Sequence, residues 1–253
     1  MKLTLDGHTA LVTGANGGLG SHFARTLAKA GAKVAVAARR LDSLREVKDA
    51  IEAAGGRAVA IALDVTEPAS VAHAFDQAAS ALGPVTVVVN NAGIAITKPL
   101  LEHTEEDWQQ VIEVNLNGAW RVAQAGARHM VKHGRGGSIV NIASILGLRV
   151  SAQVPSYAAS KAALIHLTKA MALELARHKI RVNVLAPGYV ETGINREFFE
   201  SDAGQALIKR VPQRRIGRPE ELDGALLLLA SDAGSYTTGA VIAVDGGHLV
   251  NTL

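Results

Sequence analysis

Short apolar runs alternate along the chain with longer segments in which apolar residues recur every three or four positions. The short runs predict strands that are buried on both faces, and the periodic segments predict helices. Strands are expected at residues 10–13, 34–38, 58–63, 85–89, 138–143, 181–185 and 241–244. Alternation of strand and helix from end to end predicts the α/β class, with a doubly wound parallel sheet of seven strands and helices on both faces.

The helices have recognisable ends. They are expected at residues 18–30, 42–54, from Pro68 onward, 104–131, 156–176 and 219–230. Pro68 fits the first turn of its helix, and Thr104 with Asp107 resembles a capping box. Residues 189–218 have weak periodicity and are predicted to be an insertion that covers the substrate. Residues 1–253 are otherwise expected to form one domain.

Composition narrows the class of protein. The chain has 253 residues, of which 48% are hydrophobic and 19% charged, and no cysteine. The net charge of +3 is spread along the chain without a basic tract, so nucleic acid is not an expected partner. No apolar run approaches the roughly 18 residues of a membrane span, and the amino terminus has no signal-peptide pattern. A cytoplasmic protein is expected, with no membrane partner.

A glycine-rich turn follows the first expected strand and opens the first helix. Its sequence is Thr13-Gly14-Ala15-Asn16-Gly17-Gly18-Leu19-Gly20. In this context it matches a dinucleotide-binding fingerprint, which predicts a Rossmann-like sheet with phosphates at the helix amino terminus. The cofactor contacts expected here are Gly14, Asn16, Gly17, Gly18, Leu19 and Gly20.

The end of the second strand bears on the choice of nucleotide. Arg39 and Arg40 stand where an NAD-binding chain would place an acidic residue, and Asp42 is better placed to cap the next helix. Guanidinium groups suit a 2′-phosphate, which favours NADP and leaves NAD possible. The alternative is that both arginines merely lie at a solvated strand exit.

Tyr157 and Lys161 are four residues apart in an expected helix, so they share one helix face. A cation about 4 Å away contributes roughly 4 kcal/mol at an effective dielectric of ~20, equivalent to about three pKa units before the cost of desolvation is subtracted. The pair therefore predicts a tyrosine with a lowered pKa that can serve as an acid or base. Alternatively, Tyr157 is a core residue and Lys161 a solvated one.

Together, the glycine turn and Tyr-x-x-x-Lys make the chain resemble a short-chain dehydrogenase/reductase over essentially its whole length. Further motifs occur in the order of that family: Asp64 before Val65, Asn90-Asn91-Ala92-Gly93, Asn115, Ser144 thirteen residues before Tyr157, and Pro187-Gly188 followed by Thr192. The resemblance implies further cofactor contacts at Asp64, Val65, Asn91, Ala92, Gly93, Tyr157, Lys161, Pro187, Gly188, Val190 and Thr192.

The resemblance also implies the chemistry. Hydride would pass between NADP(H) and a ketone or secondary alcohol, with Tyr157 as general acid/base. Ser144 would stabilise the developing charge on the substrate oxygen, and Lys161 would hold the nicotinamide ribose. Asn115 would position a water that links Lys161 to solvent. The alternatives are that Ser144 caps a turn and that Asn115 pins a helix bend.

The substrate is less defined. The expected pocket residues are Ser144, Leu146, Gln153, Val154, Tyr157 and Tyr189, a mostly apolar set that mildly favours an apolar ketone or acyl group. The chain also resembles 3-oxoacyl-[acyl-carrier-protein] reductases, but Leu173 stands where they commonly place a carrier-docking arginine. A sugar or polyol dehydrogenase is also compatible with these motifs, and so is a catalytically silent nucleotide sensor.

Three remaining features concern metal, lid and assembly. His129 and His133 lie at an expected helix end beside Gly134 and are interpreted as surface residues, so no metal site is expected.

The pair Phe198-Phe199 is either a lid over the substrate or an anchor of the insertion. The resemblance implies a homotetramer, in which the long helices at 104–131 and 156–176 pair across a two-fold axis.

Overall fold

The computed structural model describes residues 3–191 and 196–250. In this part of the chain seven parallel strands form one sheet, in the order β3-β2-β1-β4-β5-β6-β7. The strands are β1 (Thr9–Thr13), β2 (Lys33–Ala38), β3 (Arg57–Ala62), β4 (Val87–Asn90), β5 (Gly137–Ile142), β6 (Ile180–Pro187) and β7 (Val241–Val244). The predicted fold class is confirmed.

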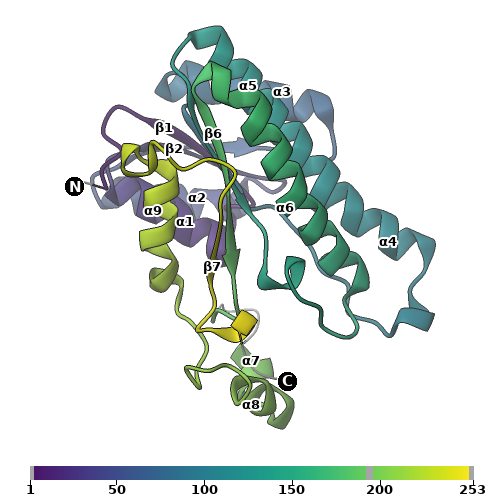
Figure 1. The fold of residues 1–253 in the computed structure, drawn as a ribbon. Helices are drawn as coiled ribbons and strands as arrows, with labels where there is room; N and C mark the ends of the chain where they lie inside the picture. Colours follow the sequence, from purple (N-terminus) through teal and green to yellow (C-terminus); the bar gives the residue numbers. More distant parts are fainter. Residues whose placement is uncertain (1–2, 192–195, 251–253) are drawn as a thin grey trace.

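Helices cover both faces of the sheet (Figure 1). They are α1 (Gly18–Lys29), α2 (Asp42–Ala53), α3 (Pro68–Leu82), α4 (Glu105–Ile112), α5 (Ala119–His133), α6 (Pro155–Leu175), α7 (Arg196–Glu200), α8 (Asp202–Ile208) and α9 (Asp223–Ala230). One core layer joins α1, α2 and α9 to the sheet, and the other joins α3, α5 and α6.

The alternation of side chains along β1 explains the two layers. Ala10 and Val12 pack against α1, whereas Leu11 packs on the opposite face, and all three are fully buried. A strand covered on both faces has no polar side, and its sequence is therefore a continuous apolar run. A short apolar run therefore indicates both a strand and its burial on the two faces of the sheet.

The segment predicted as one long helix from 104 to 131 is broken into three parts. Helix α4 begins with the expected capping box, in which the Thr104 and Asp107 side chains bond each other's backbone N–H groups. A π-helical turn, Glu113–Gly118, then separates α4 from α5. A Cβ on Gly118 would lie 2.6 Å from Cγ2 of Val65, so the helix backbone approaches the end of β3 closely here.

His129 is not a surface residue, contrary to the prediction from its place near the end of a helix. Its side chain is buried, and Nε2 accepts a hydrogen bond of 3.1 Å from the Val85 backbone N–H. Burial lowers its pKa, and the nearby His133 adds to this shift. The side chain therefore binds the backbone just before β4, which begins at Val87 rather than at residue 85.

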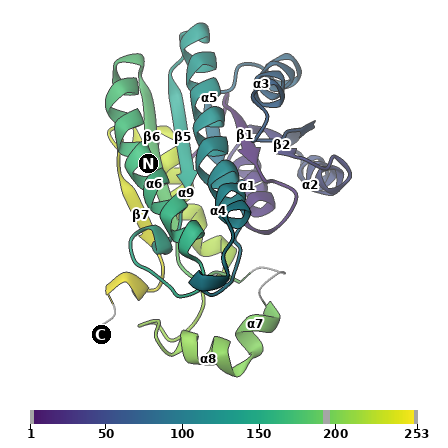
Figure 2. The ribbon, with the colours of Figure 1, turned by 90° about the vertical axis from the view of Figure 1, so that its right-hand side faces the viewer.

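The expected insertion contains two short helices, α7 and α8, which lie beyond the carboxyl ends of β6 and β7 (Figures 1 and 2). Phe199 is buried and stacks edge-on against Tyr189 at 6.1 Å between ring centroids, whereas Phe198 is 45% exposed. Phe199 thus packs against Tyr189, the first residue of the expected insertion. Thr192 lies outside the described residues.

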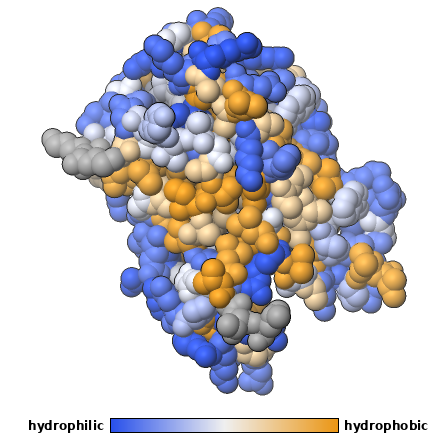
Figure 3. All heavy atoms as spheres, viewed as in Figure 1, coloured by the Kyte–Doolittle hydropathy of each residue, from blue (hydrophilic) through white to orange (hydrophobic). Residues whose placement is uncertain are grey.

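An apolar band crosses the face on which α6, β7 and α9 are seen (Figure 3). Strand β7 is the sheet edge, and its side chains are only partly covered. Leu173 on α6 is 83% exposed. Among the described residues, no helix is both long and apolar enough to cross a membrane.

Candidate active site

A two-part crevice lies at the carboxyl ends of the central strands. One part, of about 470 Å³, is lined by the glycine turn and by the ends of β2 and β3. The other, of about 440 Å³, is lined by Ser144, Tyr157 and Lys161. Gly93 and Ile94 line both parts, so the two cavities adjoin at these residues.

The glycine turn is built for close backbone approach. Gly14 has a φ of +64°, and a Cβ on Gly20 would lie 2.1 Å from the Gly14 carbonyl oxygen. The helix amino terminus therefore packs against the turn without room for a side chain. Gly17 and Gly18 face open space, which leaves their backbone accessible to a phosphate group. These features fit a dinucleotide in the larger cavity.

Side chains from β1 and β4 hold this turn in place. The Asn91 amide donates to the carbonyl oxygens of Thr13 and Gly14, at 3.1 and 3.3 Å. The Thr13 hydroxyl accepts from the backbone N–H groups of Asn91 and Ala92, both at 3.0 Å. Thr13 belongs to the predicted motif but not to the predicted site residues, although it also lines the cavity.

Arg39 and Arg40 are exposed and line the same cavity as Asp64. Burial acts to raise the pKa of Asp64, but hydrogen bonds from Thr66 and the charge of Arg39 hold it below its usual value. Asp42 does not cap the next helix as expected: it is the first helical residue, and no side-chain cap is formed. It lies instead 3.6 Å from Arg45.

Of the expected cofactor contacts, Gly17, Gly18 and Gly20 line neither cavity, and the others that the structure describes divide between the two. The structure also brings Gln110 and Val114, from α4 and the π-helical turn, into the larger cavity. The larger cavity is lined by the expected Gly14, Asn16, Arg39, Arg40, Asp64, Val65, Ala92 and Gly93, and the smaller one by Leu19, Asn91, Gly93, Tyr157, Lys161, Pro187, Gly188 and Val190. The Gln110 and Val114 contacts could not be anticipated, because they depend on the break in the helix.

Tyr157 and Lys161 share a face of α6, as their spacing predicts. Lys161 is 4% exposed, and its Nζ lies 5.5 Å from the centroid of the Tyr157 ring. The ammonium donates a hydrogen bond of 2.9 Å to the Ile142 carbonyl oxygen at the end of β5. The Ser144 hydroxyl follows β5, where it accepts from the Leu146 N–H at 3.1 Å and so also caps a turn.

The pKa of Tyr157 differs from the prediction. Burial raises it, and a hydrogen bond with Ser144 only partly opposes the shift. Burial also lowers the pKa of Lys161 to about 8. Burial is therefore the main cause of both shifts, and the Lys161 charge does not lower the pKa of Tyr157 as expected.

Asn115 is fully buried in the π-helical turn. Its Oδ1 accepts from the Ile94 N–H at 2.8 Å, and its Nδ2 donates to the Ile94 carbonyl and to the Ser160 hydroxyl. A Cβ on Gly93 would lie 3.3 Å from Asn115 Oδ1 and 3.5 Å from Lys161 Nζ. Asn115 therefore fixes the wall shared by the two cavities, directly beside Lys161.

The expected substrate pocket is only partly assembled. Ser144, Tyr157 and Tyr189 line the smaller cavity, but Leu146, Gln153 and Val154 do not. Gln153 is exposed with a φ of +67°, and its carbonyl oxygen accepts from the Lys98 N–H. The backbone turns at this residue, and Gln153 does not line the cavity despite its proximity to Tyr157 in sequence.

Two residues missed by the sequence analysis lie beside Tyr189. Its ring packs on that of His248 at 5.4 Å, and Arg149 donates to the His248 carbonyl oxygen. Burial raises the pKa of Tyr189, while Arg149 and Arg210 act against this rise. No motif marks Arg149, and only the fold shows that its charge is near Tyr189, which lines the smaller cavity.

Comparisons with known proteins agree with this geometry. A family model described as enoyl-(acyl carrier protein) reductase matches residues 14–248. The chain is 40% identical to a 3-oxoacyl-[acyl-carrier-protein] reductase of Thermotoga maritima, over 98% of this chain and 100% of that one. It is 36% identical to a 2-dehydro-3-deoxy-D-gluconate 5-dehydrogenase of Dickeya dadantii, over 97% of this chain and 96% of that one. The solved gluconate 5-dehydrogenase of Burkholderia cenocepacia, in complex with NADP and tartrate, superposes with a TM-score of 0.94 at 38% identity, covering 99% of this chain and 98% of that one.

Proposed function

The chain belongs to the short-chain dehydrogenase/reductase family, and we propose that this member is an NADP(H)-dependent oxidoreductase that interconverts a ketone and a secondary alcohol. The observation that carries the proposal is that the cavity beside the glycine turn and the cavity beside Tyr157 adjoin at Gly93 and Ile94. A dinucleotide lying along the crevice would bring one end beside Tyr157 and the other beside Arg39. Enzymes that act on CH–OH groups are the class to which the relatives belong.

The glycine turn and Asn91 would hold the pyrophosphate, and the two arginines would bind a 2′-phosphate. Arg39 and Arg40 are exposed at the cavity wall, where charge-assisted bonds to a phosphate are geometrically open. NADP, when bound, supplies or accepts the hydride. Solved relatives that contain NADP support this choice over NAD.

The residues of the chain would manage the proton and the charge on the substrate oxygen. With its pKa raised, Tyr157 carries its proton at neutral pH and can donate it to the oxygen of a ketone. The Ser144 hydroxyl would donate to the same oxygen and stabilise its negative charge. Lys161 and Asn115 form the wall behind Tyr157, so they would orient the groups that enter the crevice.

A polyhydroxy acid is the substrate class that one observation favours. Arg149 donates to the His248 carbonyl oxygen and lies close enough to Tyr189, which lines the smaller cavity, to influence its pKa, so a positive charge lies near that residue. A carboxylate suits that charge, and curated relatives include a gluconate 5-dehydrogenase. The carrier-protein alternative has less support, because Leu173, where the docking arginine was sought, is an exposed apolar residue.

A homo-oligomer remains the expected assembly. Trp108 on α4 and Trp120 on α5 are each 42% exposed, and Leu173 on α6 is 83% exposed. Large apolar side chains on adjacent helices are typical of an interface between subunits. Light scattering of the purified protein would measure the assembly, and a monomer would contradict this expectation.

A spectrophotometric panel tests the proposed function. The protein is assayed with NADPH and with NADH against 5-ketogluconate, a neutral aliphatic ketone and a 3-oxoacyl thioester. The proposal predicts oxidation of NADPH with a higher kcat/KM than NADH, and the highest kcat/KM with the keto acid. If the protein binds NADPH tightly but oxidises it with none of the three substrates, the result would instead support a nucleotide sensor.

A further inference from the structure

A cavity of about 670 Å³, larger than either part of the candidate active site, lies at the amino ends of the strands. The candidate active site lies at their carboxyl ends. The 670 Å³ cavity is bounded by the amino ends of β5 and β6 and by the loops that precede β1, β4 and β7. Its volume is within the range of small-molecule sites. None of the proposed cofactor or substrate residues lines it, so a ligand here would be separate from the reactants.

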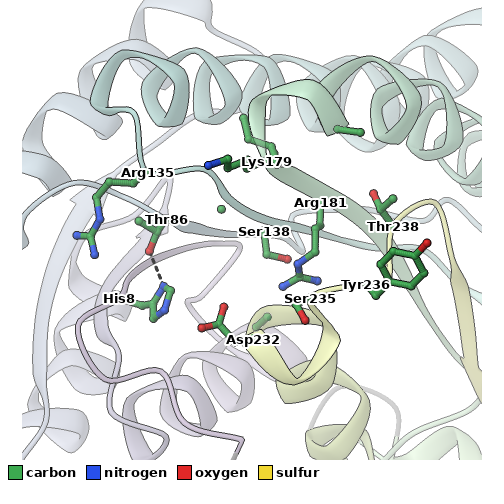
Figure 4. A pocket seen from close by; sticks show the side chains of 14 residues that line it. His8, Thr86, Arg135, Ser138, Lys179, Arg181, Asp232, Ser235, Tyr236 and Thr238 are labelled. Carbon is green, nitrogen blue, oxygen red and sulfur yellow. Dashed lines mark hydrogen bonds between the residues drawn. The ribbon is translucent and has the colours of Figure 1, made fainter.

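Three cationic side chains surround this cavity. Figure 4 shows Lys179 above the hollow, Arg135 and Arg181 on either side, and His8 and Asp232 below. Neither the Arg135 nor the Lys179 side chain makes an ion pair or hydrogen bond with any residue that the structure describes. Asp232 is the one carboxylate among the lining residues, so positive charge is in excess.

The fold holds these cations in place through its backbone. The Arg181 guanidinium donates to the carbonyl oxygens of Leu229 and Ser231, at 2.8 and 3.0 Å. Lys179 has a φ of +58°, and its carbonyl oxygen accepts from the Gly137 N–H at 3.1 Å. A Cβ on Gly136 would lie 2.5 Å from that oxygen, so the loops carrying Arg135 and Lys179 are packed backbone to backbone.

The polar groups around these cations are compatible with an anion. Burial lowers the pKa of His8, and although Asp232 opposes this shift, Arg135 and Arg181 reinforce it. The neutral ring bonds the Thr86 hydroxyl at 2.9 Å. The Thr238 hydroxyl accepts from the Val182 N–H, which leaves its own proton available for a ligand.

We propose that this cavity binds a phosphorylated small molecule, with its phosphate between Arg135 and Lys179. An arginine fork with a nearby lysine is suited to a phosphate dianion, and the two side chains come from adjacent loops that both line the cavity. Tyr236 stands at the rim with its side chain fully exposed, where it offers a ring face to a ligand that carries an aromatic base. The inference does not depend on the proposed oxidoreductase activity.

Isothermal titration calorimetry tests the proposal, with the protein saturated with NADPH so that the cofactor crevice is filled. Inorganic phosphate, ribose 5-phosphate and AMP are titrated separately, which distinguishes the phosphate alone, a sugar phosphate and a base-bearing phosphate. The variant is Arg135→Gln/Lys179→Gln. Arg181 is left unchanged because its bonds to backbone carbonyls support the fold. The control, Arg128→Gln/Lys132→Gln, removes the same charge from exposed positions on α5 that do not line the cavity.

We expect one equivalent of at least one phosphate compound to bind the wild-type protein, with affinity reduced at least tenfold in the cavity variant and unchanged in the control. Equal weakening in both variants would show general charge attraction and would overturn the proposal. So would unchanged binding in the cavity variant, or a Kd weaker than about 1 mM for all three compounds in wild type. Matching Tm values would establish that both variants fold.

Discussion

The ammonium of Lys161 lies 5.5 Å from the centre of the Tyr157 ring and is bonded to the Ile142 carbonyl oxygen. This places a cation beside the phenol, but in surroundings that remove water from both. Burial raises the pKa of Tyr157 and lowers that of Lys161. The site therefore combines a protonated tyrosine with a lysine whose charge is easily lost.

The buried lysine predicts a pH dependence of stability. Its folded-state pKa of about 8 lies below its ordinary value of 10.5, so between these limits the unfolded chain binds the extra proton. The free energy of unfolding should therefore gain up to about 3 kcal/mol from this group as pH rises from 8 to 10.5. Urea unfolding of wild type and Lys161→Met across this window measures it.

The variant should lack this gain. The unfolding free energy of wild type should therefore increase relative to that of the variant as pH rises. Lys169→Met, at an exposed position of the same helix, is the control and should follow the wild-type curve. Parallel curves for wild type and Lys161→Met would contradict the lowered pKa.

Two glycines of the same turn should respond differently to alanine. A Cβ on Gly20 would lie 2.1 Å from the Gly14 carbonyl oxygen and 2.5 Å from Asn91 Nδ2, so Gly20→Ala forces the backbone apart and should cost about 1–3 kcal/mol or more. Gly17 has extended backbone with nothing within 4 Å of an added Cβ. Gly17→Ala should have the Tm of wild type and yet bind NADPH more weakly, because the added methyl group occupies the space through which a phosphate would approach the backbone. Equal Tm values for the two variants would contradict the packing described.

The choice of nucleotide should depend on the strand-end arginines. Arg39→Ala/Arg40→Ala is expected to raise the Kd for NADPH by roughly 10- to 100-fold, since charge-assisted bonds contribute about 1.5–3 kcal/mol. The Kd for NADH should change little. Fluorescence titration of both nucleotides measures this, with Arg45→Ala on α2 as a matched loss of exposed charge. An equal loss of affinity for both nucleotides would exclude 2′-phosphate recognition.

Arg149 should affect charged substrates selectively. In Arg149→Ala the KM for a keto acid such as 5-ketogluconate should rise at least tenfold, while the KM for a neutral ketone stays near the wild-type value. Steady-state kinetics with both substrates gives the comparison, and Arg128→Ala, at an exposed position of α5, is the control. If both KM values rise together, Arg149 acts by supporting His248 rather than by binding the substrate.

The sequence predicted the sheet well because burial on both faces leaves an unambiguous apolar run in the central strands, such as β1. The edge strand β7 is only partly covered, and its apolar residues were nevertheless placed where the strand occurs. The sequence could not place the π-helical turn at Glu113–Gly118, since no local pattern distinguishes it from continuous helix. The prediction that His129 lies at the surface was wrong for a related reason. The partner of His129, the Val85 N–H, lies just before β4 and 44 positions away along the chain, so it is recognisable only in the folded chain.

For the site, the spacing of Tyr157 and Lys161 correctly predicted a shared helix face. It did not predict which electrostatic effect prevails, because desolvation depends on residues distant in sequence that pack around the pair. Leu146, Gln153 and Val154 were assigned to the pocket from nearness in sequence alone. Gln153 has a positive φ, and such a turn at a non-glycine residue leaves little trace in the sequence.

The most direct test of the proposed chemistry is Tyr157→Phe, measured by kcat for ketone reduction and by the Kd for NADPH in the same preparation. Because the ring is kept and only the proton donor is removed, turnover should fall by at least about 100-fold, with an NADPH Kd within about twofold of wild type. A variant that still turns over at the wild-type rate, or one that loses NADPH affinity and stability instead, would show that Tyr157 is a structural residue.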